Sequence, residues 1–237
     1  ARALQKLAAA GPWAQTAAGV SIHVDKRIPI AGGMAGGSAD AAAALVACNQ
    51  LWGLGLTLEQ LCQIGRTLGA DVPACIMGGM TLGQGRGDRL TSLLDPDQSL
   101  WPCHYWVMAR AHHGLSTPEV FRTLDQLREG GVPAQLSETE RQALCADADA
   151  LASVLCNDLT APALHLYPEL ATTIHEATDA GACAAILSGS GPTIAVLARN
   201  REHADELAEA LRTSSEVSAV LPTSGPAVGA IVEEEES

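Results

Sequence analysis

The sequence predicts an α+β protein with two domains, and three observations indicate this class. Amphipathic helical patterns alternate along the chain with short runs typical of strands. The composition becomes loop-like around Asp95-Pro96 and Trp101-Pro102, which places a boundary near residue 98 and gives domains of residues 1–98 and 99–237. With 237 residues, 47% of them hydrophobic, the chain can bury one large core or two modest ones, and ordinary domain sizes favour two.

The first elements lead into a glycine-rich segment. Residues 1–10 carry apolar positions at helical spacing, and residues 19–24 alternate like a strand. Paired glycines at 32–33 and 36–37 then precede a strong helical pattern over residues 41–52. Ser38 is a plausible N-cap for this helix, and Asp40 would lie in its first turn, where a carboxylate complements the helix dipole.

The following part predicts two helices and a hairpin. Leucines and an isoleucine at helical spacing predict a helix over residues 57–68, with Gly69 as its C-terminal stop. Residues 71–77 predict a short helix with Asp71 as the cap and Pro73 in the first turn, ending at Gly78-Gly79. The glycines between positions 83 and 87 predict a β-hairpin.

The second half is predicted to be a new unit of strands and helices. We expect strands at residues 105–109, 183–187, 194–197 and 216–221, and helices at about 118–128, 143–155, 168–180 and 201–212. A turn is expected at residues 188–193, between two strands, and a polar stretch at 130–142 has no predicted element. The acidic residues 233–237 are expected to be a solvated end.

Composition and charge exclude several classes of function. The formal charge is −13 and the 14 Lys and Arg residues are scattered, which argues against nucleic-acid binding. No apolar stretch approaches the roughly 20 residues of a membrane span, and no secretory signal is visible. Seven dispersed cysteines predict reduced thiols in a cytoplasmic protein and no structural metal site.

The glycine-rich segment carries the strongest chemical signal. Four glycines within six residues, Gly32 to Gly37, directly precede a helix, so the backbone can approach an anion closely and direct free N–H groups at it. The segment is neither a Walker A loop nor a dinucleotide fingerprint, because neither spacing is met. A flexible connection between strand and helix without a ligand remains the alternative.

Residues 29–42, Pro-Ile-Ala-Gly-Gly-Met-Ala-Gly-Gly-Ser-Ala-Asp-Ala-Ala, resemble the central ATP-binding motif of the GHMP kinases. The paired glycines and the preceding Asp25-Lys-Arg-Ile-Pro29 resemble the CDP-methylerythritol kinase branch more closely than the mevalonate, homoserine or galactose kinases. The resemblance implies nucleotide contacts from Lys26 and from the motif residues Pro29, Ile30, Ala31, Gly32, Gly33, Met34, Ala35, Gly36, Gly37, Ser38 and Ala39. Lys26 could instead be a surface lysine.

A second motif, Leu68-Gly-Ala-Asp-Val-Pro73, resembles the same branch at the same distance beyond the glycines. In that family the aspartate faces the γ-phosphate and the acceptor hydroxyl, so the resemblance implies that Asp71 is the catalytic residue. A carboxylate in this place can take or orient the hydroxyl proton while the phosphate cradle and Mg²⁺ hold the transferring group. A role for Asp71 as a helix cap only is the alternative, which the residues alone leave open.

Further segments resemble the same branch of kinases, but the resemblance does not assign them a role. Ser188-Gly-Ser-Gly-Pro-Thr193 is similar to a glycine-rich turn that folds towards the phosphate site, and a tight turn without a ligand is the alternative. Asn157-Asp-Leu159 and residues 115–121 also resemble it, and we assign them no chemistry. The Gly-Ser-Gly around Ser190 does not meet the nucleophile-elbow pattern, so a hydrolase is disfavoured. Trp101, Tyr105 and Trp106 could stack on a base but are more typical of a core.

The resemblance implies a ribosomal-protein-S5-like amino-terminal domain, incomplete here, and a ferredoxin-like carboxy-terminal domain. The chain lacks an initiator Met, which suggests a fragment, and neither Lys6 nor Lys26 matches the family's first-strand lysine that pairs with the catalytic aspartate. If this polypeptide is all that exists, we expect phosphoryl transfer to be very slow and the fragment to be poorly soluble.

The implied activity is ATP- and Mg²⁺-dependent phosphorylation of the 2-hydroxyl of 4-diphosphocytidyl-2-C-methyl-D-erythritol in the non-mevalonate route to isoprenoid precursors. Another GHMP small-molecule kinase and a nucleotide-binding, non-catalytic module remain as alternatives. We expect a small-molecule substrate as the partner, no nucleic acid, no membrane, and a monomer or weak homodimer.

Overall fold

The computed structural model describes residues 19–30, 32–94, 102–128 and 136–233. The chain forms two compact units. Residues 1–27, 35–97 and 227–237 belong to the first, and residues 28–34 and 98–226 to the second. The glycine-rich segment is therefore shared, because its first half belongs to the second unit and its second half to the first. The predicted helix over 1–10, the boundary near 98 and Lys6 lie outside the described residues.

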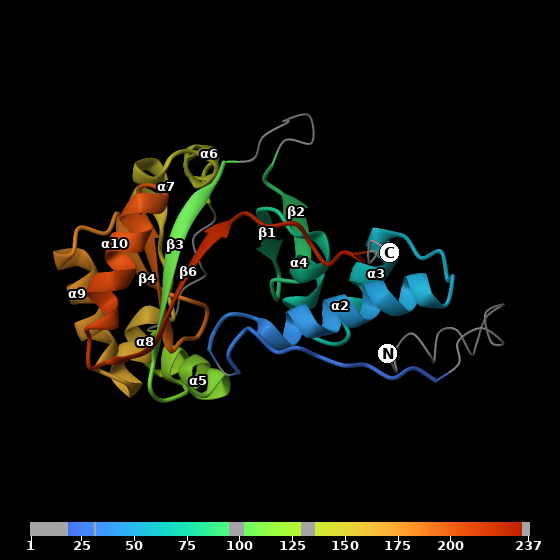
Figure 1. The fold of residues 1–237 in the computed structure, drawn as a ribbon, viewed down its shortest axis with the longest axis horizontal. Coiled ribbons are helices and arrows are strands. Elements are labelled where there is room, and N and C mark those ends of the chain that lie inside the picture. The colour runs from blue at the N-terminus through green and yellow to red at the C-terminus, as the bar shows by residue number, and fades with distance from the viewer. Residues whose placement is uncertain (1–18, 31, 95–101, 129–135, 234–237) are drawn as a thin grey trace. The chain divides into compact units, whose positions relative to one another are not determined.

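Among the described residues of the first unit, the core is made by the helices α2 (Gly36–Leu51), α3 (Leu58–Gly65) and α4 (Val72–Met77), which are labelled in Figure 1. The interior consists of alanine, leucine and cysteine side chains from α2, with Trp52 just after it, packed against apolar residues of α3 and α4, and Leu45 and Ile76 are almost fully buried. Burying each such side chain contributes about 1.5–3 kcal/mol. The predicted helix over 57–68 is confirmed but shorter, and Thr57 and Gln60 form a reciprocal capping box at its start.

The predicted strand at residues 19–24 is wrong for this structure. The segment is extended and exposed but pairs with no strand among the described residues, and a strand needs a partner for its backbone groups. It lies along α2, where an open apolar groove of about 710 Å³ includes Val20, Ile22, Ala44 and Leu51 in its lining. The predicted hairpin is confirmed as β1 (Thr81–Gln84) paired antiparallel with β2 (Arg89–Ser92).

The second unit is built on a four-stranded antiparallel sheet. Its strands are β3 (His104–Ala111), β4 (Ala184–Leu187), β5 (Thr193–Ala198) and β6 (Val217–Gly225), in the spatial order β4-β5-β3-β6. With α10 (Arg201–Arg212) between β5 and β6 and helices between β3 and β4, the connection is the ferredoxin-like βαββαβ arrangement. The four predicted strands and the helix over 201–212 are confirmed.

Helices cover both faces of this sheet. Successive side chains of β5 point to opposite faces, and those on each face contact different helices. Ile194 and Val196 join the cluster formed with α9 (Leu170–Asp179) and α10, which lie side by side in Figure 1, whereas Leu197 packs against α7 (Ala148–Val154). Tyr105 and Trp106 pack into these two clusters on opposite faces, so their interpretation as core residues is confirmed, while Trp101 lies outside the described residues.

The helices between β3 and β4 differ in part from the prediction. The single helix expected at 143–155 is two helices, α6 (Glu138–Leu144) and α7, and α6 begins inside the stretch predicted to be irregular. No residue of α6 is buried, so it carries no apolar periodicity, and its start is set by a Ser137–Glu140 capping box. A further short helix, α8 (Thr160–Leu166), was not predicted, whereas α5 (Thr117–Leu127) matches the expected helix over 118–128.

Candidate active site

The N-terminus of α2 has the form of an anion-binding site. The helix begins at Gly36, because Ala35 adopts a left-handed conformation with φ of 49° and takes the N-cap position three residues earlier than predicted. Ser38 is thus the third helical residue and not the N-cap, and Asp40 lies beyond the first turn, so both predictions are wrong. No side chain caps this end and its first turn holds no acidic residue, which leaves the first amide groups for a ligand.

Lys26 neutralises the nearest carboxylate. Its Nζ lies 2.6 Å from Oδ2 of Asp40 and also donates to the carbonyl oxygen of Gly36 at 2.8 Å. Both side chains are partly exposed, so the pair adds at most about 1 kcal/mol to the stability of the fold. The ion pair instead removes a negative charge that would oppose an anion at the helix end.

Asp71 stands at the start of α4 without acting as a side-chain cap. It occupies the N-cap position with φ of −84° and ψ of −12°, but its carboxylate accepts no capping hydrogen bond, and the residue is exposed. In the described part of the chain no cation lies within ion-pair distance of it. Burial, together with the charge of Asp71, raises the pKa of the Cys75 thiol. The carboxylate is therefore available for a ligand.

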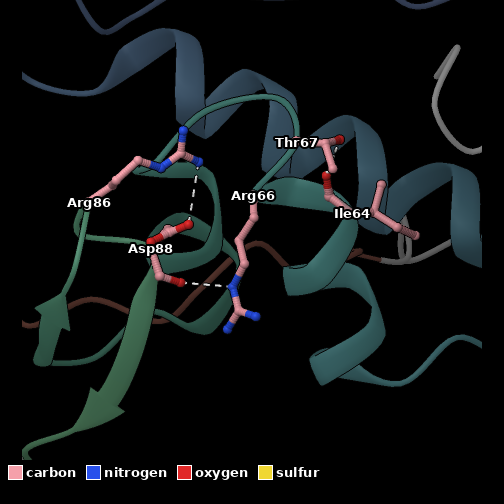
Figure 2. Close-up of polar contacts among 5 residues, drawn as sticks. All are labelled: Ile64, Arg66, Thr67, Arg86 and Asp88. Atoms are coloured by element: carbon pink, nitrogen blue, oxygen red, sulfur yellow. Dashed lines mark hydrogen bonds and ion pairs between the residues drawn. The ribbon is translucent and has the colours of Figure 1, made fainter.

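The segment that leads to Asp71 is anchored where it leaves α3, as Figure 2 shows. Arg66, at the end of α3, donates from Nε to the backbone carbonyl of Asp88 in the hairpin turn at 2.8 Å. The Asp88 carboxylate lies 3.4 Å from the guanidinium of Arg86, and the Thr67 hydroxyl donates to the carbonyl of Ile64 at 2.7 Å. These bonds fix the turn that carries the chain from α3 to Asp71.

The two motifs predicted from sequence come together in the first unit. A Cβ added to Gly69 would lie 3.9 Å from the Ser38 hydroxyl and 3.5 Å from Val72, so the turn before Asp71 runs beside the first turn of α2. Helices α2 and α4 also pack on one another. A phosphate at the end of α2 would thus have the Asp71 segment as its neighbour.

Residues 28–34 form the other half of the glycine-rich segment, with Ala31 outside the described residues. Ile30 is exposed, Gly32 is buried, and Pro29 and Met34 are the neighbours that a Cβ on Gly32 would meet. Gly33 adopts φ of 71°, and its carbonyl accepts a hydrogen bond from the Ser188 hydroxyl at 3.0 Å. The predicted turn at 188–193 therefore contacts the glycine-rich segment directly.

Sequence reasoning missed two residues that hold this turn. The Asn157 amide group donates to the carbonyls of Leu187 and Gly189, and the Thr117 hydroxyl lies 2.7 Å from the Ser190 hydroxyl. Both belong to segments whose resemblance was noted but which were given no role. The motif resemblance is the one feature of the sequence that points to them, because their hydrogen-bond partners lie 30 to 73 residues away along the chain, beyond the reach of local patterns.

The described residues also limit other kinds of site. No three His, Cys, Asp or Glu side chains gather there in a way that could hold a metal ion. Among the described helices, none combines the length and the apolar character of a membrane span.

Comparison with known proteins gives consistent matches. The family described as GHMP kinases N terminal domain matches residues 1–79, and the family GHMP kinases C terminal matches residues 141–217. A 4-diphosphocytidyl-2-C-methyl-D-erythritol kinase of Nocardia farcinica is 47% identical over 92% of this chain and 70% of its own length. A protein of the same name from Streptomyces coelicolor is 46% identical over 90% of this chain and 71% of its own length.

A solved structure gives the same result. The crystal structure of a 4-(cytidine 5'-diphospho)-2C-methyl-D-erythritol kinase superimposes with a TM-score of 0.68 at 30% identity, covering 84% of this chain and 68% of that one.

Proposed function

Because this chain belongs to the GHMP kinase family, we propose that it transfers the γ-phosphoryl group of ATP to the 2-hydroxyl of 4-diphosphocytidyl-2-C-methyl-D-erythritol. The names of the curated relatives and of the similar solved structure support this acceptor. Within the family the paired glycines and the Gly-Ala-Asp-Val-Pro motif favour it over homoserine or mevalonate.

One observation supports the proposal most directly. The uncapped first turn of α2, which contains no acidic residue, runs beside the segment bearing Asp71, whose carboxylate makes no capping bond. Free amides and a helix dipole suit the phosphates of ATP, and a free carboxylate suits the acceptor hydroxyl. In phosphoryl transfer the protein acts chiefly by positioning and by electrostatic stabilisation, and this arrangement offers both.

The roles of the residues follow from these contacts. The backbone amides of Gly36, Gly37 and Ser38 would donate to phosphate oxygens. Lys26 would neutralise the carboxylate of Asp40 near these amides. Asp71 would accept or orient the proton of the acceptor hydroxyl as the new P–O bond forms. Pro29, Ile30, Ala31, Gly32, Gly33 and Met34 would complete the nucleotide contacts, with Ala35 and Ala39 flanking the helix start.

Mg²⁺ fits the donors present. Kinase sites bind it through one or two carboxylates together with the phosphates, so a cluster of three protein ligands is not required. Asp71 and the Ser38 hydroxyl are the oxygen donors that would hold it. When bound, Mg²⁺ would offset the charge of the β- and γ-phosphates.

The setting of the enzyme is part of the proposal. None of the seven cysteines forms a disulfide in the structure, which supports the cytoplasm, because disulfides persist in oxidising compartments. We propose a small molecule as the partner, with neither nucleic acid nor membrane, and a monomer or weak homodimer. The net charge of −13 supports the exclusion of nucleic acid as a partner.

A transfer assay tests the proposal. The chain is incubated with ATP, Mg²⁺ and the proposed acceptor, and ADP and phosphorylated product are quantified by mass spectrometry over hours. Product formation that requires the acceptor and is lost in Asp71→Ala supports it. ATP binding without product in wild type favours a nucleotide-binding module, and the absence of both contradicts the proposal.

A further inference from the structure

Two sequence motifs without an assigned role converge on one turn of the second unit. Asn157 precedes α8 and Thr117 begins α5, and both form hydrogen bonds to the turn over residues 188–191. The turn also closes on itself, because the Gly191 amide donates to the Ser188 carbonyl at 2.9 Å. It is therefore supported by the start of α5 and by the segment before α8, as well as by the strands on either side of it.

Asn157 makes the stronger of the two attachments. Its amide nitrogen donates to the carbonyls of Leu187 at 2.9 Å and Gly189 at 2.8 Å, while its Oδ1 accepts from the Leu159 amide at 2.9 Å. Both N–H groups and the oxygen of the side chain are thus engaged. Only the bond to Leu159 serves the local turn before α8, and the other two reach 30 and 32 residues along the chain.

The 188–191 turn contacts Gly33 closely. The Ser188 hydroxyl donates to the Gly33 carbonyl at 3.0 Å, and a Cβ added to Gly33 would lie 2.4 Å from the Ser188 carbonyl and 2.8 Å from that of Gly191. A Cβ added to Gly189 would in turn meet the Gly33 oxygen at 3.1 Å. Apart from the bond of the Ser188 hydroxyl, these contacts are between backbones, which cannot rotate away as a flexible side chain can, so a shift of the turn must move Gly33.

We infer that Asn157 is a positioning residue for the glycine-rich segment. It holds the 188–191 turn against Gly33, and through the turn it fixes the conformation of residues 32–34. This inference rests on the proposed function, because it assigns Asn157 to ATP binding through contacts that do not include ATP. A purely local role at the start of α8 would leave both Gly33 and ATP affinity unaffected.

Asn157→Asp separates the local role from the positioning role. The change keeps the shape and the acceptor for the Leu159 amide but removes both donors, so the bonds to Leu187 and Gly189 are lost. Asn49, near the C-terminal end of α2, offers a matched control. Its side-chain amide nitrogen donates to the carbonyl of Leu56, and its Oδ1 accepts from the backbone N–H of Leu56. Asn49→Asp is the same chemical change away from the turn.

The experiment uses the full chain labelled with ¹⁵N-glycine, together with titration of ATP. In Asn157→Asp we expect the resonances of Gly189, Gly191, Gly32 and Gly33 to shift. We expect the Kd for ATP to rise by at least about fivefold, because two hydrogen bonds to the turn are lost and the loss of one of ordinary strength already corresponds to that factor. In Asn49→Asp the four resonances and the Kd should match those of wild type.

The outcomes are distinguishable. If Gly189 and Gly191 shift while Gly32, Gly33 and the Kd do not, or if Asn49→Asp has equal effects, the inference is wrong. If wild type does not bind ATP, the proposed function fails, and the glycine resonances alone still decide whether Asn157 positions Gly33. Should Asn157→Asp not fold, Ser188→Ala removes the hydroxyl bond directly. It must then shift Gly33 and raise the Kd, and wild-type values for both would overturn the inference.

Discussion

The ammonium group of Lys26 lies 2.6 Å from the carboxylate of Asp40 and also holds the carbonyl of Gly36, the first residue of α2. One cation thus ties the approach to the glycine-rich segment to the helix that follows it. The pair leaves the Asp40 carboxylate compensated beside the N-terminal turn of α2, which favours the binding of phosphates there.

Lys26→Met should therefore weaken ATP binding by on the order of tenfold, because the Asp40 charge then opposes the phosphates. Adding Asp40→Asn to Lys26→Met should restore part of the affinity by removing that charge. Isothermal titration at low salt measures both. Arg27→Met is the control, since Arg27 is exposed and, within the described ranges, forms its ion pair with Asp25 alone. Equal losses in Lys26→Met and the double variant would show that the charge balance is irrelevant.

Asp71→Ala should lower the rate of phosphoryl transfer by about 10²–10⁴-fold, the usual contribution of a general acid or base. The free energy of unfolding should change by less than about 0.5 kcal/mol, because the Asp71 side chain makes no capping bond.

Asp147→Ala is the reciprocal variant. Asp147 does cap a helix, accepting from the Ala150 amide at 2.9 Å, so its loss should cost about 0.5–2 kcal/mol of stability and leave transfer unaffected. Denaturant melts and initial rates on both variants separate the roles. If Asp71→Ala loses stability as Asp147→Ala does and keeps its rate, Asp71 is only structural.

Gly33→Ala should destabilise the protein by more than about 1 kcal/mol, because Gly33 has positive φ and its added Cβ would meet backbone oxygens at 2.4 and 2.8 Å. Gly37→Ala is the comparison. Gly37 lies inside α2 with nothing within 4 Å of an added Cβ, so this change should stabilise by about 0.4–1 kcal/mol. Chemical denaturation measures both, and a stable Gly33→Ala variant would argue against the close contact with residues 188–191.

Burial raises the pKa of the thiols of Cys62, Cys75 and Cys183, so stability should decline in alkaline solution. These thiols ionise in the unfolded chain near pH 8.5 but later in the folded one. Their contribution is complete below that pH and is lost as pH rises towards the folded values. Denaturant midpoints between pH 7 and 10 measure the decline. It should persist in Cys103→Ser, an exposed thiol, and diminish in Cys62→Ala.

Local patterns predicted much of the fold. The helix over 201–212 and the strand pairing around β5 follow from strong periodicity, and Thr193 to Ala198 is buried throughout. Helix α6 could not be predicted from periodicity, because it buries no residue. The start of α2 was missed because the left-handed Ala35 is a choice of backbone conformation that carries no residue-type signal.

Part of the candidate site could be predicted in the same way. The glycines and Asp71 are visible as motifs in the sequence. That the two motifs lie side by side, at Ser38 and Gly69, depends on the packing of α2 on α4, which local patterns do not predict. The support of Gly33 by Asn157 could not be foreseen, since it depends on hydrogen bonds between residues far apart in sequence.

Acceptor selectivity is the measurement that tests the central proposal most directly. Rates of ATP-dependent phosphorylation are compared for 4-diphosphocytidyl-2-C-methyl-D-erythritol, homoserine and mevalonate at equal concentration, with wild type and Asp71→Ala. We predict transfer to the cytidyl substrate alone, lost in the variant. Preferential phosphorylation of homoserine or mevalonate, or transfer that survives the loss of Asp71, would contradict the proposal.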